Sequence, residues 1–179
     1  MVSRIYVEKR PGFDVEARQL AGELRTILGI DGLSRVRLIN RYDVEGISSE
    51  LFDKCVPTVF SEPQADVATA ELPVEGATIA DDGSVSAPAG VAVFAVEFLP
   101  GQFDQRADSA SECVQLISQG ERPDVRSAKV YVLEGELSTA DVDAIKHYVI
   151  NPIEAREASL APRETLHMQV VNPDPVEVI

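Results

Sequence analysis

The sequence predicts an α+β fold in which two similar halves of one chain pack on each other as a pseudo-dimer. Two periodicities indicate the α+β class: apolar and polar residues alternate in some segments, as in strands, and apolar residues recur at helical spacing in others. The same series of segments occurs twice along the chain. Each copy has only about 70 residues, which is small for an independent core, so we expect the two copies to bury the faces of their sheets together.

The first half begins with a strand and a helix. Residues 4–8 alternate and end at the turn Pro11-Gly12. Asp14 is the predicted N-cap of a helix that closes at Gly29. The apolar face of this helix is expected to contain Ala17, Leu20, Ala21, Leu24, Ile27 and Leu28.

A strand pair, a second helix and a last strand complete the first half. Residues 35–45 alternate and are expected to bend into a third strand around Asn40. Ser48 begins a helix whose predicted apolar face contains Leu51, Phe52, Cys55, Val56 and Val59. Residues 66–72 are the last predicted strand. The segment from Pro73 to Gly90, rich in Gly, Ala, Ser, Asp and Pro, is interpreted as a linker or long loop.

The second half repeats this pattern. The stretch VFAVEFLPGQFDQRA matches IYVEKRPGFDVEA, with an offset of 89 residues at Pro11/Pro100 and of 90 from Phe13/Phe103 onward, so one residue is inserted near Gln102. The stretch SAKVYVLEGELS likewise mirrors VRLINRYDVEGIS. The offset of 90 holds for Asp14/Asp104, Ala17/Ala107, Ser48/Ser138 and Asp53/Asp143. Two copies indicate an internal duplication and not a long repeat array.

The second helix of each half begins with the same predicted capping pattern. Ser48 and Ser138 are the predicted N-caps, and Asp141, three residues after Ser138, adds a capping-box signal to the second copy only. An apolar pair that can form a hydrophobic staple flanks each cap: Ile47 with Phe52, and Leu137 with Val142.

These patterns divide the chain into four parts. Residues 1–72 are the first half, 73–90 the linker, 91–150 the core of the second half, and 151–179 a connector with one candidate strand, TLHMQVV. The chain ends on VEVI without a closing signal, as expected of a piece of a larger polypeptide.

Composition and charge exclude several classes of function. The formal net charge is -14, from 16 basic and 30 acidic residues, and such a surface repels nucleic acid and anionic lipid. No apolar stretch approaches the roughly 20 residues needed to span a bilayer. The start, MVSRIYVEKR, lacks the apolar region of a signal peptide, so we expect a cytoplasmic protein that binds neither nucleic acid nor membrane.

The two cysteines and the two histidines do not indicate a catalytic or metal-binding site. Cys55 and Cys113 each fall on the apolar face of a predicted helix, and buried reduced thiols are the favoured interpretation, ahead of a disulfide or a nucleophile. A catalytic cysteine needs a nearby histidine, and only His147 and His167 exist. We expect both histidines to be surface or boundary residues.

No familiar catalytic motif is present. The chain lacks phosphate-binding glycine loops, HExxH, zinc-spaced cysteine pairs and GxSxG. Tyr6, Tyr42 and Tyr131 lie in predicted strands and are expected in the core. No catalytic, cofactor-binding or metal-binding residue is therefore assigned, and we expect this chain alone to be inactive.

The candidate contact site is the polar run that enters the first helix of the second half. It contains Gln102, Asp104, Gln105, Arg106, Asp108 and Ser109. The interpretations, in order of preference, are capping with a solvated helix face, a docking surface for another domain, and direct substrate contact. Arg106 and Asp108 point outward if the helix buries Ala107, Ala110, Val114 and Ile117.

Five segments in order resemble one known region: RIYVEKRPGFDVEA, VRLINRYDVEGIS, LPGQFDQRADSA, AKVYVLEGELS and YVINPIEAREASL. They are similar to the N-terminal PurS-like domain of the large, single-chain phosphoribosylformylglycinamidine synthase. The resemblance covers nearly all of the chain, and residues 151–179 match the start of the family's linker. It implies two PurS-like βαββαβ-type halves with antiparallel sheets and helices on one face.

The resemblance also implies a function for the parent polypeptide, a ligase of purine biosynthesis. The family uses ATP and glutamine to convert formylglycinamide ribonucleotide to its amidine. ATP and Mg are expected in the synthetase domains that follow, and a separate glutaminase releases ammonia. Neither catalytic unit is in this chain, so its partners are expected to be the synthetase and glutaminase domains of the same polypeptide.

The role that follows from the resemblance is a scaffold that docks the two catalytic units and helps enclose the ammonia path. The segment from Gln102 to Ser109 is then expected to belong to the contact surface. The alternative is a regulatory α+β domain that senses a small molecule where the halves meet.

Overall fold

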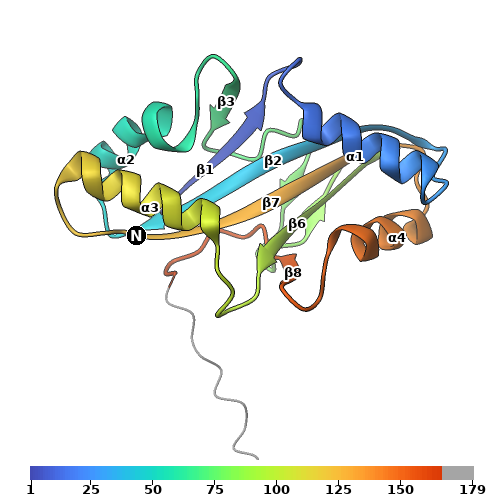
Figure 1. The fold of residues 1–179 in the computed structure, drawn as a ribbon. Coiled ribbons are helices and arrows are strands. Elements are labelled where there is room, and N and C mark those ends of the chain that lie inside the picture. Colours follow the sequence, from blue (N-terminus) through green and yellow to red (C-terminus); the bar gives the residue numbers. More distant parts are fainter. Residues whose placement is uncertain (167–179) are drawn as a thin grey trace, which may run out of the picture.

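The computed structural model describes residues 1–166 and contains one six-stranded antiparallel sheet with the strand order β3-β1-β2-β7-β6-β8 (Figure 1). The strands are β1 (Val2–Lys9), β2 (Leu33–Glu45), β3 (Asp66–Thr69), β6 (Val91–Phe98), β7 (Asp124–Gly135) and β8 (Ala155–Ala158). The helices are α1 (Val15–Thr26), α2 (Ser49–Cys55), α3 (Gln105–Ser118) and α4 (Thr139–Val149), and α2 continues into a π-helical turn, η1 (Val56–Phe60). The mixed α+β class with an antiparallel sheet is thus confirmed. The expectation that the two copies bury the faces of their sheets together is wrong, because β2 pairs with β7 edge to edge and all six strands belong to one sheet.

The predicted bend around Asn40 is wrong. β2 runs without a break from Leu33 to Glu45, and Asn40 lies directly opposite Lys129 of β7. Residues 35–45 contain no Gly or Pro that would break a strand. The middle of each half is therefore one long strand, and the element order is strand, helix, strand, helix, strand.

The predicted helix starts hold, with one difference. The hydroxyl groups of Ser48 and Ser138 accept hydrogen bonds from the amides of Leu51 and Asp141, and Asp141 completes a capping box. Asp14 stands at the start of α1, but its carboxylate accepts from the amide of Gly12, two residues earlier, and not from a helix amide.

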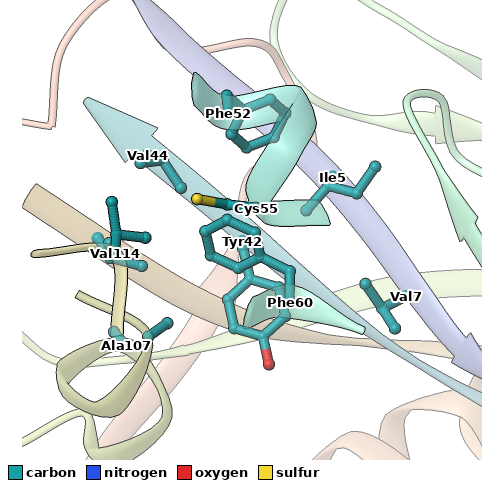
Figure 2. Packing of buried hydrophobic residues seen from close by; sticks show 11 residues of the cluster. Ile5, Val7, Tyr42, Val44, Phe52, Cys55, Phe60, Ala107 and Val114 are labelled. Atoms are coloured by element: carbon teal, nitrogen blue, oxygen red, sulfur yellow. The ribbon is translucent and has the colours of Figure 1, made fainter. Parts of the chain in front are cut away.

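The side of the sheet covered by the helices, here called the helix face, contains two separate cores. The first surrounds Cys55, which is fully buried and packs in one cluster with Tyr42 and Phe60, whose ring centroids are 5.0 Å apart (Figure 2). Ala107 and Val114 of α3 close this core. It therefore combines β1, β2 and α2 with a helix from much later in the chain.

The second core of the helix face lies at the other end of the sheet, where α1 and α4 meet (Figure 1). Leu24 of α1 is packed in one cluster with Leu133 of β7 and Ile145 of α4, and all three are fully buried. Phe94 and Tyr131 stack in the same cluster with centroids 4.9 Å apart.

The opposite side of the sheet, here called the back face, is covered by irregular segments and a small hairpin. Strands β4 (Thr78–Ile79) and β5 (Val85–Ser86) form this hairpin within the segment interpreted as a linker. The core of the back face contains Tyr6, Ile39, Val74, Ala95, Val130, Val132, Ala158 and Leu160, joined by partly buried residues of the hairpin. Residues 72–86 thus close a hydrophobic layer of the domain.

The connector after Ile150 also contributes a strand, β8, which pairs with the edge of β6. The candidate strand TLHMQVV does not begin at Thr165 and Leu166, which lie in irregular structure. His167 and the rest of that segment lie outside the described residues.

Candidate functional site

The candidate contact site lies on the loop between β6 and α3 and on the first turns of α3. Gly101 in this loop has φ +87°, and Gly12 has φ +93° in the corresponding loop of the first half. Both glycines follow a proline, and this backbone conformation is one that glycine adopts without steric cost. The repeated Pro-Gly pair therefore forms the same kind of turn before each helix.

Asp104 has a structural role. Its carboxylate caps α3 by accepting from the amide of Ala107 at 3.0 Å. It also accepts from the hydroxyl and the amide of Ser127 on β7, at 2.7 and 2.8 Å. These bonds fix the start of α3 on the sheet, so its carboxylate is already engaged within the chain.

Asp108 is likewise engaged, with a residue that the sequence did not single out. It forms an ion pair with Arg122, whose guanidinium also donates to the hydroxyl of Ser111 at 3.0 Å. The Ser111 hydroxyl in turn donates to the carbonyl of Pro123 at 2.6 Å. This network ties the end of the α3–β7 loop to the helix.

The remaining predicted residues are exposed. The side chains of Gln102, Gln105 and Ser109 face solvent, and Arg106 makes one long hydrogen bond, 3.5 Å, to the hydroxyl of Tyr42. The run therefore contains two residues whose carboxylates are bonded within the chain, Asp104 and Asp108, and four residues whose side chains remain available at the surface.

Large apolar side chains are exposed beside this run. Phe103, which precedes α3, is 70 % exposed, and Leu116, near the end of α3, is 71 % exposed. We call the following exposed residues the α3 surface: Gln102, Phe103, Gln105, Arg106, Ser109, Cys113 and Leu116. Open hollows of about 390 and 440 Å³ flank it, the first between Arg106, Cys113 and Tyr42 and the second beside Phe103.

Two residues of α3 depart from their predicted environment. Cys113 is exposed and Ile117 is 51 % exposed, although both were expected to face the core. The helix packs through a narrow stripe of Ala107, Ala110, Ser111 and Val114, and the two residues lie beside that stripe.

Ile27, expected on the apolar face of the first helix, is also 65 % exposed, whereas the predicted environments of Cys55, the three strand tyrosines and His147 hold. Cys55 is buried, and burial raises the pKa of its thiol, which disfavours the nucleophilic thiolate. Tyr6, Tyr42 and Tyr131 are buried, and His147 is exposed.

A buried charged cluster on the back face was not anticipated. Arg4 holds Asp43 with two hydrogen bonds, from Nε at 2.6 Å and from Nη2 at 3.1 Å. Arg163 holds Glu97 through Nη2 at 3.0 and 3.2 Å. Arg41 lies between them, 1 % exposed, with its Nε 3.6 Å from Asp43. We call these five residues the arginine cluster.

Burial dominates the electrostatics of the arginine cluster. The pKa of Arg41 is lowered to about 10, chiefly by burial. The negative charge of Asp43 acts to raise this pKa, and the positive charges of Arg4 and Arg163 act to lower it. The pattern RVRLINRYDVE carried a signal: the residues alternating with apolar ones are mostly charged. The alternation does not reveal that residues 72–86 and 158–160 cover the face of β2 that carries these charges.

A cavity of about 680 Å³ adjoins the arginine cluster. Val2, Arg4, Tyr6 and Asp43 form its wall on the sheet, and residues 70–72, 77, 79–81 and 160–163 form the rest. It is the largest of the hollows described above and the one nearest to buried charge.

The described residues contain neither grouped metal ligands nor a helix able to span a membrane. Within residues 1–166, no three His, Cys, Asp or Glu side chains are grouped to hold a metal ion. Over the same part of the chain, no helix has the length and apolar character needed to cross a membrane.

The fold and the site define an α+β domain with an exposed, partly apolar helix surface. No protein-family model, curated protein or solved structure matches this chain.

Proposed function

We propose that this chain is a PurS-like scaffold domain of a phosphoribosylformylglycinamidine synthase, built as an intrachain pseudo-dimer. It docks the synthetase and glutaminase domains of the same polypeptide and helps enclose the passage of ammonia between them. The observation that carries the proposal is the symmetry of strand pairing across the centre of the sheet, together with the sequence resemblance.

The strand registers support the pseudo-dimer. Val2 pairs with Glu45 in the first half, and Val91 pairs with Glu134 in the second, so that both members shift by 89 residues. The strand order β3-β1-β2 is followed by β7-β6-β8, its mirror in the second half. Equal pairing within each half is what a duplicated unit requires.

The pairing between the halves is also symmetric. The strand registers match β2 to β7 at an offset of 89, one less than the offset of 90 expected for residues after Phe13. At this offset Asn40 of β2 pairs with Lys129 of β7, its own counterpart. Leu38 pairs with Tyr131, and their counterparts, Ser127 and Tyr42, pair with each other. Exchanging the halves therefore leaves this set of pairs unchanged, as in a two-fold dimer.

The packing of the helices supports an interlocked body. The core around Cys55 belongs to the first half but is closed by α3 of the second. The core around Ile145 is built from both halves, since Leu24 and four other buried residues of the first half pack with Phe94, Tyr131, Leu133 and Ile145 of the second. Each helix-face core contains residues of both halves, so neither core is complete in one half alone. This favours one rigid domain over two hinged modules.

The α3 surface is the proposed docking surface. Exposed Phe103 and Leu116 can bury apolar area against another domain, and the flanking polar residues can form its rim. Sealing such a contact matters for the proposed function, because ammonia that reaches bulk water is protonated and loses its nucleophilic lone pair.

The test compares two activities of the full-length synthase. Arg106→Ala should lower glutamine-dependent turnover more than turnover driven by added ammonium salt, since only the first needs a sealed passage. Arg18→Ala, which removes an exposed arginine of α1, is the control and should leave the ratio of the two activities unchanged. An Arg106→Ala enzyme with equal losses in both assays, or with none, would contradict the docking role.

A further inference from the structure

We propose that the cavity beside the arginine cluster binds a small ligand with one phosphate or carboxylate group, held by Arg4 and Arg163. This site lies on the back face, away from the α3 surface, and goes beyond the scaffold role. It also differs from a site where the halves meet, because its wall is formed by β1, by Asp43 of β2 and by the segments that cover the back face.

The charges of the cluster favour an anion. Its three guanidinium groups share two carboxylates, and all five side chains are largely removed from water. The exposed fractions are 12 % for Arg4, 2 % for Arg41, 21 % for Arg163, 1 % for Asp43 and 9 % for Glu97. Buried charge is costly unless it is paired, so a further negative group beside the cluster is stabilising.

The cluster also has hydrogen-bond donors to spare. Nε of Arg41 is buried without an acceptor. Arg4 uses Nε and Nη2 for Asp43 and one donor of Nη1 for the carbonyl of Leu160 at 3.0 Å. A guanidinium has five N–H donors, so Arg4 retains two, and Arg163, which uses only Nη2 for Glu97, retains more. Arg4 and Arg163 both line the cavity and can offer these donors to an oxyanion.

The rest of the cavity limits the class of ligand. Leu72, Ile79 and Leu160 supply an apolar wall. Exposed Glu71 and Asp81 also line the cavity, and they repel a ligand with several negative charges. The geometry fits a molecule with one anionic group at the arginines, an apolar or ring portion, and a donor or cationic group toward the two acids.

Calorimetry and thermal unfolding with three probes test this assignment: inorganic phosphate, adenosine monophosphate and leucine, which carries a single carboxylate. Binding of adenosine monophosphate or inorganic phosphate without leucine identifies a phosphate site, and binding of leucine identifies a carboxylate site. Adenosine, which has the ring but no anionic group, should bind at least about tenfold more weakly than its monophosphate, since a charge-assisted contact contributes about that factor.

Two matched variants locate the binding. Arg163→Gln should weaken the bound probe about tenfold or more, whereas Arg156→Gln should change its affinity less than about threefold. Arg156 also contacts Glu97, at 3.7 Å, but does not line the cavity, so it controls for loss of that ion pair. Ala70→Phe, at an exposed position of the cavity, should block binding without removing a buried group.

The proposal is overturned if none of the three probes stabilises the wild-type protein, or if Arg163→Gln and Ala70→Phe bind as the wild type does. Either result leaves the scaffold role intact, because that role is tested by the ratio of glutamine-dependent to ammonium-dependent turnover.

Discussion

Leu24→Ala tests the interlocking of the two halves at a single side chain. Leu24 lies in α1 but is fully buried in a cluster with Phe94, Leu133 and Ile145, which come from the second half of the chain. The substitution removes three carbon atoms and leaves a cavity, for which we expect a loss of about 3–4 kcal/mol in the free energy of unfolding. In a chain of this size the melting temperature should fall by about 10 °C.

Urea unfolding followed by circular dichroism measures this loss, and native-state hydrogen exchange shows where it acts. Leu116→Ala is the matched control, because the same atoms are removed from a side chain that is 71 % exposed, and it should cost less than about 0.5 kcal/mol. We expect Leu24→Ala to lower the protection of amides in α4 and β7 as well as in α1. A loss under about 1 kcal/mol, or one confined to α1, would refute the reasoning.

Three further predictions concern individual side chains. Asp43→Asn should cost about 3–5 kcal/mol in urea unfolding, because it leaves buried arginines unpaired, while Asp108→Asn, in an exposed pair, should cost less than about 1 kcal/mol. Ser138→Ala removes the cap of α4 and should cost about 1 kcal/mol by the same assay; an unchanged midpoint would show that the cap is dispensable. Burial, aided by the negative charge of Glu16, raises the pKa of Tyr131 from 10.0 to about 12. The native state thus favours the protonated phenol, and stability should fall as the pH rises from about 10 through 12; Tyr131→Phe should remove that loss and the phenolate transition near pH 12 in ultraviolet titration.

Local rules predicted the starts of the helices and the class of the fold. Ser48 and Ser138 cap α2 and α4 because the serine hydroxyl accepts a hydrogen bond from the amide three residues later in the chain. This contact is local, so its prediction does not require knowledge of the tertiary structure. The continuity of β2 through Asn40 depends on its partner Lys129, almost ninety residues away, and a polar residue in mid-strand could not reveal that partner.

Burial was harder to predict where it depends on segments without periodicity. The hairpin at residues 78–86 has the composition of a linker, yet Ile79 and Val85 pack against the back face. Arg41 and Asp43 are buried for the same reason, since residues 158–160 cover the face of β2 that carries them. Cys113 fails in the opposite direction: its helix is amphipathic, but the buried stripe is narrow because small residues bring α3 close to the sheet.

Denaturant-dependent hydrogen exchange of β2 and β7 tests the shared body most directly. If the two halves form one interlocked unit, the slowest amides of both strands should open with a single free energy and a single dependence on urea concentration. Amides of β7 that stay protected at a urea concentration where those of β2 have already opened, or the reverse, would show that the halves are separate folding units.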